Sequence, residues 1–156
     1  MVWKPHVTVA AVVEDRGRFL MVEERPDGDA LVYNQPAGHL DPNESLLHAV
    51  VRETREETGW GFEPEAVVGV YLWQPRAEDA ERSFLRVAFS GRLTDHDPDQ
   101  PLDEEIVRAA WHTPETLNRA GGQLRSPLVM QCIWDYQADR RYPLELLSHL
   151  LPPGCP

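Results

Sequence analysis

The sequence predicts an α/β fold, and more closely an α/β/α sandwich in which helices flank a mixed β-sheet. Three observations predict it. Short segments rich in β-branched residues recur along the chain, an apolar-periodic helix follows the third of them, and two further helix starts lie in the last third. No internal repeat or change of composition divides the 156 residues, so we expect one domain over residues 1–156 with a substantial core.

The expected strands are short and bounded by turn residues. The first is almost continuously apolar, as strands buried on both faces are. Residues 15–17 form the turn to its hairpin partner, and residues 85–93 alternate between apolar and polar, which is typical of a half-buried strand. The expected strands are 6–13, 19–24, 31–35, 66–73, 85–93 and 106–111, and loops are expected over 26–29, 36–38, 74–82 and 94–99.

Helix starts are marked by capping residues and prolines. Residues 113–114 have the N-cap and first-position proline of a short helix, and residues 126–127 open another that runs to about residue 138. Residues 142–144 begin a tail with a last helical turn. The principal helix has its entry at residues 41–43 and a glycine stop at Gly59.

The principal helix carries an apolar face beside an acidic one. At about 100° per residue, six residues share the side that should face a core, and they are Leu46, Leu47, Val50, Val51, Thr54 and Thr58. Glu53, Glu56 and Glu57 fall on a neighbouring arc, and Glu57 lies at the margin of the apolar stripe. Carboxylates three and four residues apart repel one another, and exclusion of water near the core strengthens that repulsion.

A divalent hard cation would offset this repulsion. Arg52 can pair with Glu56 one turn away, but one cation does not balance three carboxylates. Oxygen ligands on one helical face suit Mg²⁺ or Mn²⁺, so the three glutamates indicate a metal site. The alternative is a solvated acidic face without a ligand, which is common in glutamate-rich helices.

The spacing of residues around this helix resembles the Nudix box. The pattern is Gly, five residues, Glu, seven residues, then Arg-Glu-x-x-Glu-Glu-x-Gly, and it is matched by Gly38, Glu44, Arg52, Glu53, Glu56, Glu57 and Gly59. Two positions depart from the family pattern. Thr54 stands where an aliphatic residue is usual, and Trp60 fills the last apolar position with a large ring. The Thr54 hydroxyl is expected to bond back to the Val50 carbonyl.

The resemblance implies the Nudix fold, which is an α/β/α sandwich, and a catalytic metal site. It implies that Glu56 and Glu57 are the principal metal ligands and that Glu53 is a ligand or a proton acceptor. It also implies that the Gly38 carbonyl is a further ligand. One to three Mg²⁺ ions, with Mn²⁺ as the other candidate, would neutralise phosphoryl oxygens and activate water.

The same resemblance assigns supporting roles. Arg52 and Glu44 would position the cluster or its loop. Glu105 stands six residues before Trp111, and Nudix proteins often place a metal-binding or base carboxylate on the loop before that strand. Glu104 is an alternative to Glu105, and a solvated loop is the alternative for both. The general base is left open, because geometry decides it.

Segments outside the box are similar to the bacterial NudJ-type phosphatases, a group within the family. These segments are residues 4–10, 34–40, 124–129 and 141–145. The group implies hydrolysis of nucleoside tri- and diphosphates and of thiamine-pathway pyrophosphates, with release of orthophosphate. The alternative enzyme is a nucleoside triphosphate pyrophosphatase that releases pyrophosphate. The alternative from another class is a non-catalytic nucleotide-sensing module.

Several side chains are candidates for contacts with the substrate. The candidates for phosphate contacts are Lys4, His6, Arg86 and Arg125, each of which could equally be a surface cation. Tyr33, Trp73 and Trp134 could stack on a heteroaromatic ring, although core packing is the preferred interpretation for each.

The bulk properties restrict the partners. A net charge of −11 argues against a nucleic-acid polymer, but not against a small phosphorylated substrate, because a bound cation can bridge acid to phosphate. No segment reaches the length of a membrane span, and the first residues lack a signal peptide's apolar segment. Cys132 and Cys155 have no disulfide or metal spacing, and we expect Cys132 in the core and Cys155 as a thiol of the tail. We therefore expect a cytoplasmic protein with no membrane partner, and the choice between monomer and homodimer stays open.

Overall fold

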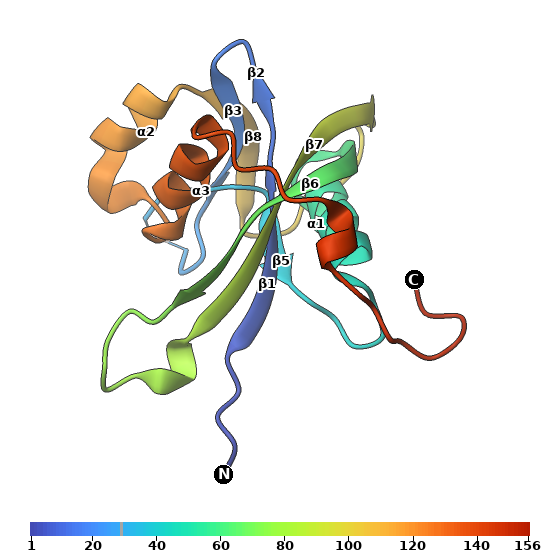
Figure 1. Ribbon diagram of the computed structural model, residues 1–156. Helices are drawn as coiled ribbons and strands as arrows, with labels where there is room; N and C mark the ends of the chain where they lie inside the picture. Colours follow the sequence, from blue (N-terminus) through green and yellow to red (C-terminus); the bar gives the residue numbers. More distant parts are fainter. Residues whose placement is uncertain (29) are drawn as a thin grey trace.

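The computed structural model describes residues 1–28 and 30–156 and contains two β-sheets (Figure 1). Asp29, at the end of the loop expected over residues 26–29, lies outside the described residues. The first sheet has the strand order β5-β1-β7-β6. Its strands are β1 (His6–Val12), β5 (Ala37–His39), β6 (Trp60–Trp73) and β7 (Phe84–His96). β1 and β7 run parallel and the other neighbours run antiparallel, which confirms the mixed sheet.

The second sheet is antiparallel and is organised around β3. Its strands are β2 (Glu14–Asp15), β3 (Arg18–Glu24), β4 (Val32–Asn34) and β8 (Ile106–His112). β3 pairs with each of the other three, and all its residues after Arg18 are buried. The hairpin that joins β1 to β3 therefore links the centres of the two sheets.

Helices cover the mixed sheet on both sides, which confirms the α/β/α sandwich. α1 (Leu46–Thr58) lies on one side, while α3 (Leu128–Gln137) and α2 (Pro114–Ala120) lie on the other (Figure 1). Residues 1–28 and 30–156 also contain three short 3₁₀ helices, which span Ala80–Arg82, Gly121–Gln123 and Leu144–Leu146.

The continuous apolar sequence of β1 follows from this layering. Val9 and Ala11 pack with Val50 of α1, whereas Ala10 and Val12 pack with Ile133 of α3. Successive side chains of a strand point to opposite faces. A strand with a helix on each side must therefore be apolar at both sets of positions.

α1 begins later than its expected entry at residues 41–43. Asn43 has a φ of 65°, a left-handed conformation that no helix residue adopts. Ser45 is the N-cap instead, and its hydroxyl accepts a hydrogen bond of 3.0 Å from the His48 N–H. The bond expected from the Thr54 hydroxyl to the Val50 carbonyl is present at 2.7 Å. Gly59 ends the helix as predicted, with a φ of 75°.

The strands differ from the expected ones where pairing partners are distant in sequence. The break expected over residues 36–38 overlaps β5, because residues 37–39 pair with β1. β6 begins at Trp60 and β7 continues to His96, since these two residues face each other across the strand pair. Their rings stack with centroids 4.3 Å apart. The sequence around each residue gives no local sign of this pairing.

The C-terminal segment crosses the molecule from β6 to the start of α1 (Figure 1). Tyr142 exchanges two backbone hydrogen bonds of 2.8 Å with Val67. Farther along, the His149 Nε2 atom accepts a bond of 3.1 Å from the Leu46 N–H, and the Pro156 carbonyl accepts one of 2.6 Å from the Ser45 N–H. The segment thus satisfies donors at the N-terminus of α1 that the helix itself leaves unpaired.

Two single residues complete the comparison with the expected core. Cys132 is fully buried, as predicted. Trp134 is 51% exposed on α3, so its expected place in the core was wrong. Among the helices of residues 1–28 and 30–156, none is long and apolar enough to span a membrane.

Gly59→Ala should lower the free energy of unfolding by about 2 kcal/mol. A Cβ at this left-handed residue would lie 2.7 Å from the Asp97 carbonyl oxygen, so the substitution combines backbone strain with a steric conflict. Urea denaturation measures the change. Gly122→Ala is the matched control, because its Cβ would meet no atom within 4 Å. Equal stability of the two variants would contradict the assignment.

Candidate active site

A cleft of about 630 Å³ brings together acidic, basic and aromatic side chains. Its volume lies within the range of about 300–1,000 Å³ that is usual for small-molecule sites. The acidic residues in its lining are Glu24, Glu53, Glu57, Asp103 and Glu105, the basic ones are His39, Arg82, Arg86 and Arg125, and the aromatic ones are Trp73 and Phe84. The cleft can therefore contact a cation, an anion and a ring.

Three carboxylates converge at the acidic part of the cleft. One oxygen from each of Glu53, Glu57 and Asp103 lies within 4.8 Å of the others. α1 places Glu53 and Glu57 one turn apart on the same face. Asp103 comes from the loop before β8, and its backbone N–H donates to the Glu56 carbonyl at 3.1 Å. These three residues could hold a metal ion.

The environment of the cluster favours binding of a cation. Glu53 and Glu57 are 8% and 6% exposed. Burial, together with Glu56 and Asp103, raises the pKa of Glu53 to about 7 despite the opposing effect of Arg52. Burial also raises the pKa of Glu57 well above its ordinary value, and the hydrogen bond from the Ala37 N–H at 2.7 Å only partly opposes it. Nearby positive charge would relieve this excess of buried acid.

Gly38 allows β5 and α1 to approach each other. A Cβ at this position would overlap the Glu53 carboxylate, so any other residue would displace that side chain from the cluster. Its carbonyl belongs to the same strand as Ala37, whose N–H bonds to Glu57. The glycine requirement is therefore steric.

Arg52 connects the acidic residues of α1 to the preceding loop. Its Nε and Nη2 atoms donate to the two oxygens of Glu44 at 3.0 and 2.6 Å, a bidentate pairing. Its Nη1 atom donates to Glu53 at 2.8 Å and to Glu56 at 3.2 Å. Glu44 also accepts bonds from the Asp41 N–H and from His48. Arg52 and Glu44 therefore form one hydrogen-bonded network with Glu53 and Glu56.

Comparison with known proteins shows the family to which this chain belongs. A model of the NUDIX domain matches residues 4–131. The chain belongs to the Nudix family. It is 44% identical over 146 residues to proteins named Phosphatase NudJ from Escherichia coli K12 and Shigella boydii, and each alignment covers 94% of this chain and 92% of the relative.

Solved structures agree with this Nudix assignment. A NUDIX hydrolase from Nitrosomonas europaea is 49% identical and superposes with a TM-score of 0.89, covering 94% of this chain and 97% of that one. A MutT protein from Methanosarcina mazei shares the fold at a TM-score of 0.68 and 22% identity, covering 90% of this chain and 100% of that one. The protein is a Nudix hydrolase, and the predicted Nudix fold is confirmed.

The remaining acidic candidates of this Nudix hydrolase divide into two groups. Glu105 lines the cleft. Among the described residues, Glu56 and Glu104 stand outside the lining. The Glu56 side chain is 38% exposed and reaches Arg52, which leaves it beside the carboxylate cluster.

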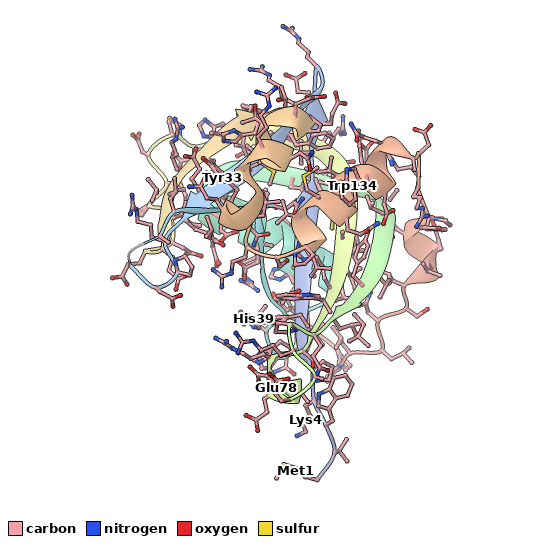
Figure 2. All side chains as sticks on the ribbon, turned by 90° about the vertical axis from the view of Figure 1, so that its left-hand side faces the viewer. Met1, Lys4, Tyr33, His39, Glu78 and Trp134 are labelled. Carbon is pink, nitrogen blue, oxygen red and sulfur yellow. The ribbon has the colours of Figure 1, made fainter. Side chains whose placement is uncertain are left out.

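The four phosphate-contact candidates divide in the same way. Arg86 and Arg125 line the cleft, whereas Lys4 and His6 do not belong to its described lining. Figure 2 shows Lys4 on the N-terminal extension that leads away from the sheet toward Met1. His6 contacts the cleft indirectly, because its Nδ1 atom lies 3.2 Å from the Nε2 atom of His39.

The sequence patterns did not predict that Asp103 and Glu24 lie in the cleft. Asp103 stands in an acidic run, but nothing local shows that the run folds back onto α1. Glu24 ends the apolar strand β3, and it accepts a bond of 3.2 Å from Arg125. Burial raises its pKa, and Glu105 adds to the shift while Arg125 opposes it. The one sequence signal for Glu24 was its place as an acidic residue at the end of an apolar strand.

Glu44→Gln should lower the free energy of unfolding at pH 7 by about 2 kcal/mol, because an amide cannot make charge-assisted bonds to Arg52. Arg52 lowers the pKa of Glu44 from its ordinary value of 4.5 to about 2. A group with a lowered folded pKa stabilises the protein fully above its unfolded pKa and loses that contribution as the pH falls. The difference between wild type and variant should therefore shrink between pH 4.5 and pH 2.

Urea denaturation at pH 7, 5, 4 and 3 measures this difference. Glu78→Gln is the control, since Glu78 is exposed on the loop between β6 and β7 and should show no change. A loss of stability for Glu44→Gln that stays constant down to pH 3 would contradict the role of the charged pair.

Proposed function

We propose that this Nudix hydrolase cleaves phosphoanhydride bonds in small nucleoside tri- and diphosphates or thiamine-pathway pyrophosphates and releases orthophosphate. The observation that carries the proposal is the convergence of Glu53, Glu57 and Asp103 within 4.8 Å in a cleft that also contains Arg86 and Arg125. The name Phosphatase carried by the 44% identical relatives supports orthophosphate as the product.

The site residues fit Mg²⁺, with Mn²⁺ as the alternative. Glu53, Glu57 and Asp103 would hold the ion, and Glu56 and the Gly38 carbonyl would complete its oxygen ligands. When bound, Mg²⁺ supplies charge neutralisation for phosphoryl oxygens and lowers the pKa of water. The donor set supports this assignment, because all its atoms are oxygens and the buried carboxylates lack a sufficient countercharge.

The other residues would orient the substrate and accept a proton. The water oxygen forms a bond to the attacked phosphorus, the bridging P–O bond breaks, and the water loses a proton. We propose that Glu105 accepts this proton, because it is a carboxylate in the cleft lining; Glu53 is the alternative acceptor. Arg125 and Arg86 would contact phosphate oxygens, whereas Arg52 holds Glu53 and Glu56 in place.

Two alternatives make different predictions for the products. A pyrophosphatase would release pyrophosphate from a nucleoside triphosphate, and phosphorus NMR separates it from the proposed phosphatase. A nucleotide-sensing module would bind such compounds without turnover. The complete set of box carboxylates favours an enzyme over a sensor.

Glu57→Gln should reduce kcat by at least about 100-fold, because a neutral amide is a poor ligand for a hard cation and leaves less charge opposite the phosphate. The measurement is orthophosphate release from a nucleoside diphosphate with Mg²⁺. Glu104→Gln is the matched control, since Glu104 is an exposed acid outside the described cleft lining. A folded Glu57→Gln variant with wild-type turnover would refute the assigned role.

The affinity for Mg²⁺ should rise by about tenfold or more between pH 6 and pH 8. Glu53 has a pKa raised to about 7, and the pKa of Glu57 is also raised. Protons therefore compete with the ion below neutral pH. Calorimetric titration in two buffers of different ionisation enthalpy measures both the affinity and the protons released. A pH-independent affinity without proton release would exclude these ligands.

A further inference from the structure

Two neighbouring rows of side chains cross the mixed sheet at the cleft. Phe84 and Arg86 are two residues apart on β7, so both point to the same face, about 7 Å apart. The strand register sets His6 and Trp73 beside Phe84, and Thr8 and Tyr71 beside Arg86. We call these the aromatic row (His6, Phe84, Trp73) and the polar row (Thr8, Arg86, Tyr71).

The aromatic row forms a stacked set of rings. His6 and Phe84 have centroids 5.3 Å apart at an interplanar angle of 27°, and Trp73 and Phe84 have centroids 5.7 Å apart at 24°. Trp73, Phe84 and the nearby Pro75 line the cleft. They present an apolar surface on which a flat ring can pack.

Arg86 is a buried cation with neutral partners. It is 5% exposed, and no other arginine among the described residues is buried. Its Nη1 atom donates to the Gln35 side-chain oxygen at 3.1 Å and its Nη2 atom to the Asn34 side-chain oxygen at 3.2 Å. In the described part of the chain, no carboxylate forms an ion pair with it, in contrast to Arg52 and Arg125. The charge of Arg86 acts on Glu24, where it opposes the rise in that carboxyl's pKa, but the two groups form no direct ion pair. A phosphate in the cleft would give the guanidinium a direct anionic partner.

The partners of Arg86 hold the guanidinium in a fixed position. Gln35 is 1% exposed, and its amide Nε2 donates to the Val129 carbonyl at 2.8 Å. This bond turns the amide oxygen toward Arg86. Asn34 bonds to Glu24 as well as to Arg86. Arginine has five N–H donors. Gln35 and Asn34 take two of them, the Cys132 side chain is a further partner, and the others remain for a ligand in the cleft.

We propose that the members of the two rows that line the cleft bind the half of the substrate that is not transferred. Arg86 binds the phosphate that stays on the organic group, and the surface of Trp73 and Phe84 packs against its ring. The acidic cluster lies elsewhere in the same cleft, where the transferred phosphate would bind. This proposal rests on the proposed phosphoanhydride hydrolysis. It selects di- and triphosphates that carry a heteroaromatic ring, and disfavours alkyl diphosphates.

The aromatic row is tested with Trp73→Ala and two substrates. Loss of ring packing should raise KM for cytidine diphosphate about tenfold and leave KM for ethyl diphosphate unchanged, while kcat changes little for either. Trp134→Ala is the matched control, because Trp134 is a half-exposed tryptophan on α3, outside the described lining of the cleft. A KM increase shared by both substrates would overturn the ring assignment.

The polar row is tested with Arg86→Met and Arg86→Lys. Arg86→Met should weaken binding of cytidine monophosphate, measured without metal, by at least about tenfold, and Arg86→Lys should restore part of it because the positive charge remains. Arg92→Met is the control, since Arg92 is exposed and pairs with Glu63. A purely structural role would lower the melting temperature of both Arg86 variants without this order of affinities, and that result would overturn the proposal.

Assays of the wild-type enzyme distinguish a failure of the proposed hydrolysis from a failure of the proposed substrate binding by the two rows. Failure to hydrolyse any phosphoanhydride would overturn the proposed function, while cytidine monophosphate binding that depends on Arg86 and Trp73 would still support the two rows. Hydrolysis of cytidine diphosphate and ethyl diphosphate with equal KM would support the proposed function and overturn the selection of ring-bearing substrates.

Discussion

The guanidinium of Arg52 binds both oxygens of Glu44 and also reaches Glu53 and Glu56. This fork allows several carboxylates to lie along one face of α1, because it supplies a fixed positive charge among them. It also ties the loop before the helix to the helix itself. One cation still leaves an excess of negative charge at Glu53, Glu57 and Asp103. Burial raises the pKa values of the two glutamates, and the neighbouring carboxylates add to that rise.

The carboxylate cluster also requires close approach between α1 and the edge of the mixed sheet. β5 is only three residues long, yet it supplies both the Ala37 N–H that binds Glu57 and the glycine beside Glu53. The helix contributes acids and the strand contributes backbone groups. A larger side chain at residue 38 would push the helix and the strand apart. The geometry of the cluster therefore depends on the absence of a Cβ at Gly38.

Sequence patterns predicted the parts of the molecule that depend on near neighbours. The apolar run of β1, the periodicity of α1 and the spacing from Gly38 to Gly59 were all readable, because each reports local geometry. Asp103 and Glu24 were not readable as members of the site, since tertiary folding alone brings their loop and strand to α1. β5 and the outer parts of β6 and β7 were missed for the same reason: their pairing partners lie far away in the sequence. Trp134 shows the opposite error, because an aromatic residue in an apolar helix need not face the core.

The contact between His149 and the first turn of α1 joins residues 103 positions apart. A helix normally completes its first turn with side chains close by, whereas here part of that role falls to a distant imidazole. The first turn of the acid-bearing helix is therefore held by a segment far downstream, so the placement of its carboxylates depends on residues outside the described lining of the cleft.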